Sequence, residues 1–249
     1  MTIKLAITGK GGSGKTTIVK AFMHIFEEMY PDKSILLFDN DLTSELAHSF
    51  GLDIRNTIYG IRSGKHEYKT GIPEDMSKSE FIEWALEEII VPINDNVDII
   101  ESWFVGSKDC RCPITKQIND AVYKLINRYD FVIFDCEFDL KYLNQLVDIE
   151  IDSTIIVANP SEESAHLAQR IKEFSAKHAA GTQLGVVINK VDNNKMMVLS
   201  ELLHKYDLDI LGTIPYDPEL EKNPIQRESQ IVQNSVRAFY SRLNLPQQD

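Results

Sequence analysis

Short apolar runs alternate with longer amphipathic segments along this chain of 249 residues. The apolar runs are typical of buried parallel strands and are expected at Ile3–Thr8, Ser34–Asp39, Val97–Glu101, Phe131–Asp135, Thr154–Ala158, Gln183–Asn189 and Asp209–Thr213. Helical spacing predicts helices at Lys15–Tyr30, Lys78–Ile90, Lys116–Arg128, Ser164–His178, Met196–Tyr206 and Ile225–Leu243. This alternation predicts an α/β fold, a mostly parallel sheet flanked by helices on both faces.

Residues 52–95 break the alternation. They are polar, contain three glycines (Gly60, Gly64 and Gly71) and hold one clear helical pattern. We interpret them as an insertion within a single domain that spans residues 1–249. With 43% hydrophobic residues, a chain of this length can bury a sizeable core.

Charge and cysteine content narrow the function classes. The formal net charge of −12 opposes a broad nucleic-acid surface, so no nucleic-acid partner is expected. The start of the chain lacks a signal-peptide pattern, and no apolar run approaches the roughly 20 residues that span a bilayer. We therefore expect a cytoplasmic protein without stable membrane association. Three cysteines are too few for a disulfide framework.

The segment Gly9–Thr17 (GKGGSGKTT) matches the phosphate-loop pattern G-x-x-x-x-G-K-[ST], between the first predicted strand and the first predicted helix. Glycines let several backbone N–H groups converge on phosphate oxygens, and the following helix adds the positive end of its dipole. Lys15 is expected to reach the β- and γ-phosphates of ATP, and the Thr16 hydroxyl to ligate Mg²⁺. The predicted nucleotide-binding residues of the loop are Gly11, Gly12, Ser13, Gly14, Lys15, Thr16 and Thr17.

Carboxylates follow two further predicted strands. Asp39 and Asp41 end one, and Asp135 ends another, and the carboxyl ends of parallel strands face the ligand crevice. We expect Asp135 to contact Mg²⁺ through water, and Asp39 to support the loop or the Mg²⁺ water shell. A plain helix cap remains an alternative for Asp41.

Lys10 is a second lysine early in the phosphate loop, and the loop as a whole resembles that of the MinD/ParA/nitrogenase-iron-protein class of dimeric ATPases. The resemblance implies that Lys10 reaches across a dimer interface to the partner's nucleotide and that Asp41 orients the attacking water. It also implies that Asn189, at the end of a predicted strand, reads the adenine. A solvated lysine and a strand-end turn asparagine are the simpler alternatives.

Cys110 and Cys112 form a C-x-C pair in a polar turn closed by Pro113. Two thiolates at this spacing suit Zn²⁺ or Ni²⁺ but supply half of a tetrahedral four-sulfur site, which a homodimer axis would complete. The alternative is that Cys110 and Cys112 are two reduced surface thiols that bind no metal. Cys136 directly follows Asp135 and is expected to be a buried residue with no metal role.

A narrower resemblance covers nearly the whole chain. The deviant phosphate loop, Glu101–Pro113, Asp135–Leu140 and Leu211–Leu220 together resemble the CooC family of accessory ATPases for nickel-containing carbon monoxide dehydrogenase. The resemblance implies an ATP-dependent homodimer that holds Ni²⁺ or Zn²⁺ through Cys110 and Cys112, with Pro215 packing against the adenine. It further implies a nickel enzyme such as carbon monoxide dehydrogenase as the client.

One departure and three alternatives stay open. Asp139 stands where that family usually has a glycine after the strand-end aspartate, which restricts the backbone and adds negative charge near the phosphates. An iron–sulfur reductase or scaffold would use the same thiolates for a cluster. A MinD/ParA-type positioning ATPase would need a membrane or DNA surface, for which Ile231–Leu245 offers only two arginines. A small-molecule kinase would leave Lys10 and the C-x-C pair without a role.

Overall fold

The computed structural model describes most of the chain. The described residues are 1–41, 43–63, 72–102, 113–137, 150–178, 183–192, 201–202, 204–208, 210–222, 228–243 and 245. Cys110, Cys112 and Asp139 lie outside them, as does most of the helix predicted at Met196–Tyr206.

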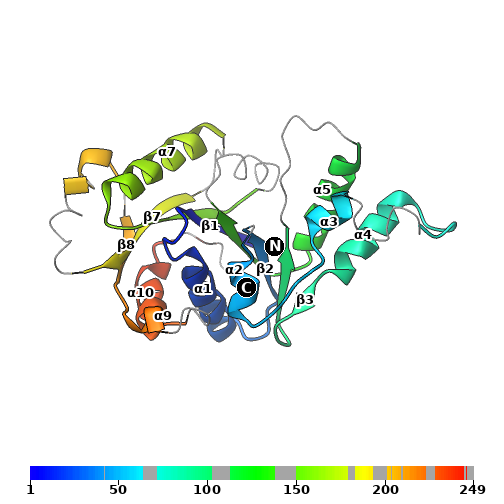
Figure 1. The fold of residues 1–249 in the computed structure, drawn as a ribbon, viewed down its shortest axis with the longest axis horizontal. Helices are drawn as coiled ribbons and strands as arrows, with labels where there is room; N and C mark the ends of the chain where they lie inside the picture. Colours follow the sequence, from blue (N-terminus) through cyan, green and yellow to red (C-terminus); the bar gives the residue numbers. More distant parts are fainter. Residues whose placement is uncertain are drawn as a thin grey trace.

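An eight-stranded sheet forms the centre of the described structure (Figure 1), in the order β3-β4-β2-β5-β1-β6-β7-β8. All neighbouring strands pair in parallel except β3, which is antiparallel to β4. The predicted α/β class, with a mostly parallel sheet, is therefore confirmed. The strands are β1 (Ile3–Gly9), β2 (Ile35–Asn40), β3 (Val91–Pro92), β4 (Val97–Glu101), β5 (Phe131–Glu137), β6 (Ser153–Ala158), β7 (Gln183–Val191) and β8 (Ile210–Pro215).

Helices cover both faces of this sheet, so the central strands β1, β2 and β6 are fully buried, whereas the edge strands β3 and β8 are partly exposed. In β1, Leu5 and Ile7 face α1 and α10, whereas Ala6 faces the cluster formed with α3, α4 and α5. In Figure 1, α1 and α10 lie below the sheet and α7 lies above it. The helices are α1 (Lys15–Met29), α2 (Glu45–Ser49), α3 (Ile58–Ser63), α4 (Lys78–Glu88), α5 (Pro113–Ile126), α7 (Glu162–His178), α9 (Glu219–Lys222) and α10 (Gln230–Tyr240).

Residues 52–95 contain more regular structure than their sequence pattern predicts. Besides the predicted helix, which becomes α4, they form α3 and the short edge strand β3. α4 packs against α5 over one face of the sheet, and the capping box of Ser77 and Glu80 fixes where α4 begins. The expectation of a single helix in this region was wrong, because short buried elements carry too few periods to show in the sequence.

The strand order brings the carboxyl ends of β1, β2, β4 and β5 to one edge of the sheet. β1 lies between β5 and β6, and α1 covers the opposite face from α7. Ligands of open α/β sheets bind at such a point, where successive connections leave toward opposite sides. The phosphate loop leaves β1 at this position.

Candidate nucleotide site

The phosphate loop curls through residues in the left-handed region of backbone conformation. Gly12 has φ 73° and Gly14 has φ 96°, values that residues with a Cβ adopt at a cost. The loop is closed by a hydrogen bond of 3.0 Å from the Ser13 N–H to the Lys10 carbonyl. Gly14 caps α1, whose first turn has no side-chain cap and no acidic residue. The exposed N–H groups of that turn therefore suit an anion such as a phosphate.

Lys15 and Thr16, the first residues of α1, are buried against the end of β5. The Thr16 hydroxyl donates a 2.8 Å hydrogen bond to Asp135 Oδ2, whereas Asp135 Oδ1 is buried without a hydrogen-bond partner. Burial raises the pKa of Asp135 to about 6, and Lys15 and Thr16 act in the opposite direction. A hydroxyl beside a carboxylate with one unsatisfied oxygen fits the ligand chemistry of Mg²⁺. The structure thus brings together the two residues expected near Mg²⁺, and their roles toward the ion stay predictions.

Three acidic residues lie side by side at the ends of neighbouring strands. Asp39 pairs in register with Glu101 of β4 on one side and with Asp135 of β5 on the other. Burial and the Asp135 carboxylate raise the pKa of Asp39 well above its ordinary value. Burial raises the pKa of Glu101 to about 7. Asp39 Oδ1 also accepts a 3.0 Å hydrogen bond from the Asp41 N–H, so Asp39 supports this loop, as predicted.

Asp41 is buried next to this row, and its side chain stabilises a turn. Asp41 Oδ1 accepts hydrogen bonds from the Thr43 N–H at 2.8 Å and from the Thr43 hydroxyl at 2.7 Å. The N-cap position of α2 is occupied by Ser44, so Asp41 caps the turn between β2 and α2 and not the helix itself. Glu45, which follows in α2, lines the cavity beside the phosphate loop, and no sequence pattern had pointed to it. The water-orienting role of Asp41 stays a prediction.

Asn189 and Lys190, at the end of β7, hold the phosphate loop from the other side. Asn189 Nδ2 donates a 2.8 Å hydrogen bond to the Ser13 carbonyl, and Lys190 Nζ donates one of 2.9 Å to the Gly12 carbonyl. A Cβ on Gly14 would lie 2.3 Å from Asn189 Nδ2. Asn189 therefore positions the phosphate loop through its side-chain amide. This role was not predicted, since the sequence analysis expected Asn189 only to contact the adenine.

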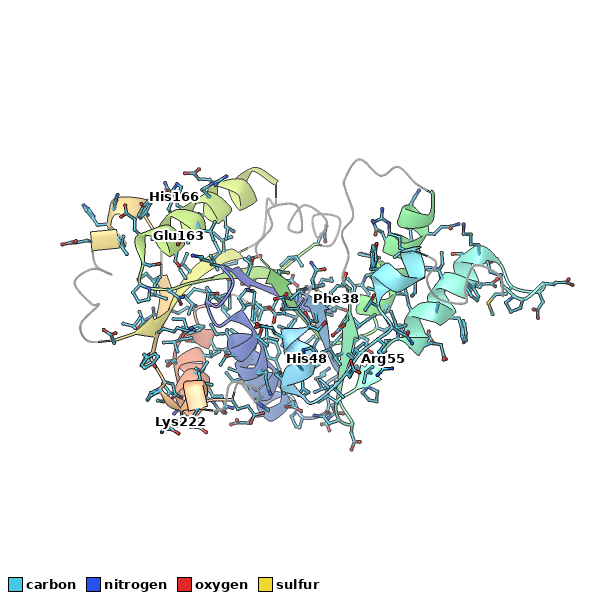
Figure 2. All side chains as sticks on the ribbon, viewed as in Figure 1. Phe38, His48, Arg55, Glu163, His166 and Lys222 are labelled. Atoms are coloured by element: carbon cyan, nitrogen blue, oxygen red, sulfur yellow. The ribbon has the colours of Figure 1, made fainter. Side chains whose placement is uncertain are left out.

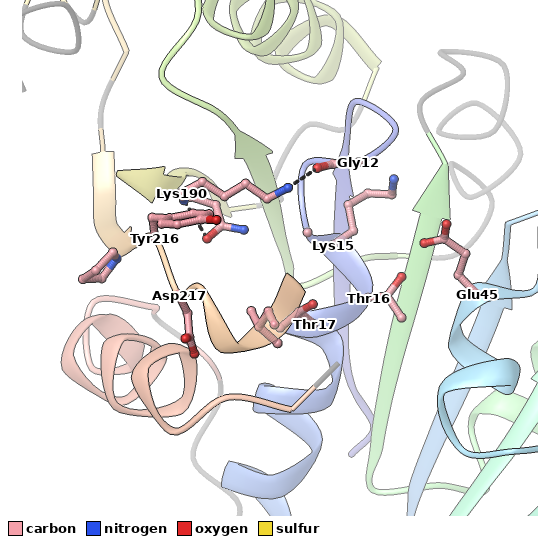
Figure 3. Close-up of a pocket in the computed structure, with 12 residues that line it drawn as sticks. Gly12, Lys15, Thr16, Thr17, Glu45, Lys190, Tyr216 and Asp217 are labelled. Carbon is pink, nitrogen blue, oxygen red and sulfur yellow. Dashed lines mark hydrogen bonds between the residues drawn. The ribbon is translucent and has the colours of Figure 1, made fainter. Parts of the chain in front are cut away.

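A cavity of about 210 Å³ opens beside the loop. Figure 3 shows Lys190, Tyr216 and Asp217 on one side of α1 and Glu45 on the other. The full set of lining residues is Gly12, Gly14, Lys15, Thr16, Thr17, Glu45, Asn189, Lys190, Pro215, Tyr216, Asp217 and Leu220. Pro215, predicted to pack against adenine, thus lines the same cavity as the phosphate loop. Tyr216, Asp217 and Leu220, which follow Pro215 in the segment expected to pack against adenine with it, line the cavity too.

Lys10 is not among the residues that line this cavity. Its ammonium lies 2.6 Å from the carboxylate of Glu163, at the start of α7 (Figure 2), and both side chains are exposed. Glu163 was not foreseen, since nothing in the sequence relates α7 to the loop. Cys136 is buried and free, as predicted. In the described part of the chain, no three histidine, cysteine or acidic side chains gather as a metal site, and no helix has the length and apolarity to cross a bilayer.

The family of the chain follows from its sequence. Residues 4–231 match the family described as CbiA, the CobQ/CobB/MinD/ParA nucleotide binding domain. The chain belongs to this family. It is accordingly a P-loop ATPase of the MinD/ParA type, and the cavity beside Lys15 is the candidate nucleotide site.

Individual relatives agree with this assignment. The chain is 28% identical over 250 residues to an uncharacterized ATP-binding protein of Methanocaldococcus jannaschii, covering 95% of this chain and 96% of that protein. It is 21% identical over 241 residues to the carbon monoxide dehydrogenase accessory protein CooC of Rhodospirillum rubrum, covering 88% and 86%. The fold matches the septum site-determining protein MinD of Pyrococcus horikoshii complexed with Mg-ADP, with a TM-score of 0.67, 18% identity and coverage of 98% and 96%.

We predict that Gly14→Ala abolishes nucleotide binding. Its Cβ would collide with Asn189, and its left-handed φ is strained for alanine, so the loop must open. Gly11→Ala is the matched control, because no atom lies within 4 Å of its added Cβ and its backbone N–H is kept. Isothermal titration with Mg-ADP should detect binding to Gly11→Ala and none to Gly14→Ala. Equal affinities in the two variants would contradict the loop geometry.

A second prediction concerns Glu101 and pH. Its pKa in the folded chain is about 7, against an ordinary 4.5, so between these pH values the folded chain keeps a proton that the unfolded chain releases. The contribution of Glu101 to the free energy of unfolding therefore falls as pH rises from 4.5 to 7. Glu101→Gln cannot ionise, so the variant should gain stability over the parent chain as pH rises through this window.

Thermal unfolding of both proteins at pH 5 and pH 8 measures this gain. Glu88→Gln, on the exposed end of α4, is the control and should follow the parent chain at both pH values. A difference between Glu101→Gln and the parent that is the same at pH 5 and pH 8 would show that Glu101 is ionised throughout.

Proposed function

We propose that this chain is an ATPase that dimerises on ATP and uses hydrolysis to control a metal ion carried between its two protomers. The metal, Ni²⁺ or Zn²⁺, is the cargo, and the client is a nickel enzyme such as carbon monoxide dehydrogenase. The observation that carries the proposal is the placement of Lys10. It extends from the phosphate loop but lies outside the cavity of its own protomer.

In this proposal, Lys10 acts on a second nucleotide site that comes within its reach when two protomers close. Lys15 already occupies the phosphate end of the cavity, and Lys190 donates to the loop at its rim. The charge of Lys10 is balanced by Glu163, an exposed pair that contributes at most about 1 kcal/mol. Such a pair is readily exchanged for a phosphate of the partner's nucleotide, a stronger charge-assisted contact.

The residues of one protomer account for binding and for most of the hydrolytic chemistry. Loop N–H groups and Lys15 hold the β- and γ-phosphates, while Thr16 and Asp135 would hold Mg²⁺, which offsets phosphate charge when bound. Asp41 accepts from Thr43 through Oδ1, and in this proposal its other carboxylate oxygen orients the attacking water. Lys10 of the partner then neutralises charge that develops on the phosphates.

The similarity to CooC over most of both chains supports the metal part of the proposal. Cys110 and Cys112 lie outside the described residues, but they belong to the segment that follows Glu101 and Ser102 at the end of β4. That strand end adjoins β2, which leads into the Asp41 loop. Closure around ATP would bring two C-x-C pairs into one four-thiolate site, and hydrolysis would separate them.

The C-terminal helix α10 gives little support to the alternative of a MinD/ParA-type positioning ATPase. The apolar face of α10 packs on α1 and β8 through its three buried residues, Val232, Val236 and Phe239. Anchoring in a bilayer would require this face to leave the core. The MinD-like fold by itself does not favour a membrane role for this chain, since fold alone does not determine function.

We predict that Glu163→Gln lowers the nucleotide concentration at which the protein dimerises. The substitution removes the carboxylate that holds Lys10 within its own protomer, so less free energy opposes closure. For an exposed pair worth up to about 1 kcal/mol, the expected change is about two- to fivefold. Titration with a non-hydrolysable ATP analogue, followed by analytical ultracentrifugation, gives the midpoint.

Glu162→Gln is the matched control. It removes the same charge from the adjacent position of α7, where Glu162 pairs with Lys205. Its midpoint should equal that of the parent chain, and Lys10→Ala should not dimerise at any nucleotide concentration. If Glu162→Gln and Glu163→Gln shift the midpoint equally, the effect is general electrostatics and the Lys10 pair has no part in it.

The metal part has its own test. The double variant Cys110→Ser, Cys112→Ser should bind the ATP analogue and dimerise like the parent chain but retain no stoichiometric Ni²⁺ or Zn²⁺ after gel filtration. The parent should retain one metal ion per dimer, measured by elemental analysis. Metal retained by the double variant would contradict the proposal, and visible charge-transfer absorbance with bound iron in the parent would favour the iron–sulfur alternative.

A further inference from the structure

Lys20 lies on α1, beyond the phosphate loop, and is almost fully buried, with 1% of its surface exposed. Lysine is rarely buried unless its ammonium is paired. Lys20 Nζ donates a 3.1 Å hydrogen bond to the Ser49 carbonyl and lies 3.2 Å from Glu228 Oε1. It also lies 4.2 Å from the centre of the Phe50 ring, within cation–π distance. Neither the nucleotide-binding nor the dimer proposal gives this residue a role.

Ser49 and Glu228 do not line the cavity themselves, but each belongs to a segment connected to residues that do. Ser49 and Phe50 form the end of α2, the helix that starts at Glu45 beside the phosphate end of the cavity. Lys20 therefore fixes α2 from its far end. The Asp41 turn leads directly into this helix, because the Ser44 N–H donates to the Asp41 carbonyl at 3.2 Å.

Glu228 connects Lys20 to the Pro215–Leu220 side of the cavity. The next residue, Ser229, caps α10 by accepting from the Val232 N–H at 3.1 Å, and its hydroxyl donates to Asp217 Oδ2 at 2.5 Å. Asp217 lines the cavity, and its Oδ1 accepts from the Glu219 N–H at 2.9 Å. These contacts tie the Pro215–Leu220 wall to the segment that Lys20 holds.

We propose that Lys20 is a positioning residue that fixes both walls of the nucleotide cavity to the helix that carries the phosphate loop. Lys15–Thr17 and Lys20 lie on the same rigid helix, so one buried ammonium sets the distance of each wall from the phosphates. The Glu228 branch orders the wall that includes Pro215 and Tyr216. The Ser49 branch orders α2 and, through it, the turn that holds Asp41.

The two branches predict different kinetic effects. Glu228→Gln weakens only the Pro215 side, so the dissociation constants of Mg-ADP and of a non-hydrolysable ATP analogue should rise together, by about fivefold or more. Its kcat should stay within about twofold of the parent, because uniform loss of binding does not change the chemical step. Lys20→Met frees both walls, and misplacement of the Asp41 turn should also lower kcat by about ten- to hundredfold.

Glu28→Gln is the matched control. Glu28 also joins α1 to α10, through Arg237, but this pair lies outside the Lys20 contacts. It should leave dissociation constants and kcat unchanged. All assays are run at a temperature where circular dichroism shows each variant to be folded, and Glu228→Gln, which alters an exposed carboxylate, still tests the idea if Lys20→Met does not fold.

A purely structural Lys20 would give another pattern. Glu228→Gln would then lower the melting temperature while its nucleotide dissociation constants remain those of the parent and of Glu28→Gln. That result would overturn the proposal. Loss of kcat in Glu228→Gln without any change in affinity would also contradict it, since the Glu228 branch does not lead to Asp41.

Discussion

The left-handed backbone at Gly12 and Gly14 is the constraint on which the rest of the site depends. It turns the chain from β1 into α1, and the first turn of that helix, which lines the cavity, has no side-chain cap. The loop is held in this form by Asn189 and Lys190 on its carbonyls. The strand order places β5 and β7 on either side of β1 and β6, so residues of both outer strands lie beside this loop. The uncapped N–H groups at the start of α1 favour an anion.

Three lysines of the loop and its helix differ chiefly in where they are placed. Lys15 is buried at the cavity and faces Asp135, so its charge is available to phosphate. Lys10 is exposed and pairs with Glu163, so its charge can be exchanged for that of a partner's ligand. Lys20 is buried away from phosphate and holds the cavity walls. We propose that these three lysines respectively bind the nucleotide, contact a second protomer and fix the shape of the site.

Much of this could be predicted from the sequence, because the apolar runs and the loop motif are local signals. Periodicity was enough to predict the strands at Ile3, Phe131 and Thr154. The loop motif and the strand-end carboxylate were enough to place Thr16 and Asp135 at one site, but not to predict the hydrogen bond between them. The contacts of Glu45, Glu163 and Lys20 could not be foreseen, since each joins segments far apart in the chain through a single side chain. For a lysine at an otherwise apolar position of a helix, the sequence does not show whether the ammonium is exposed to solvent or buried and paired.

The central claim is that ATP brings two copies together and that Lys10 requires the second copy. Native mass spectrometry with ADP and with a non-hydrolysable ATP analogue tests it most directly, because it reports protomer number, nucleotide and metal in one spectrum. The account predicts a monomer with ADP, and with the analogue a dimer that contains two nucleotides and one metal ion. A monomer in both states would contradict it.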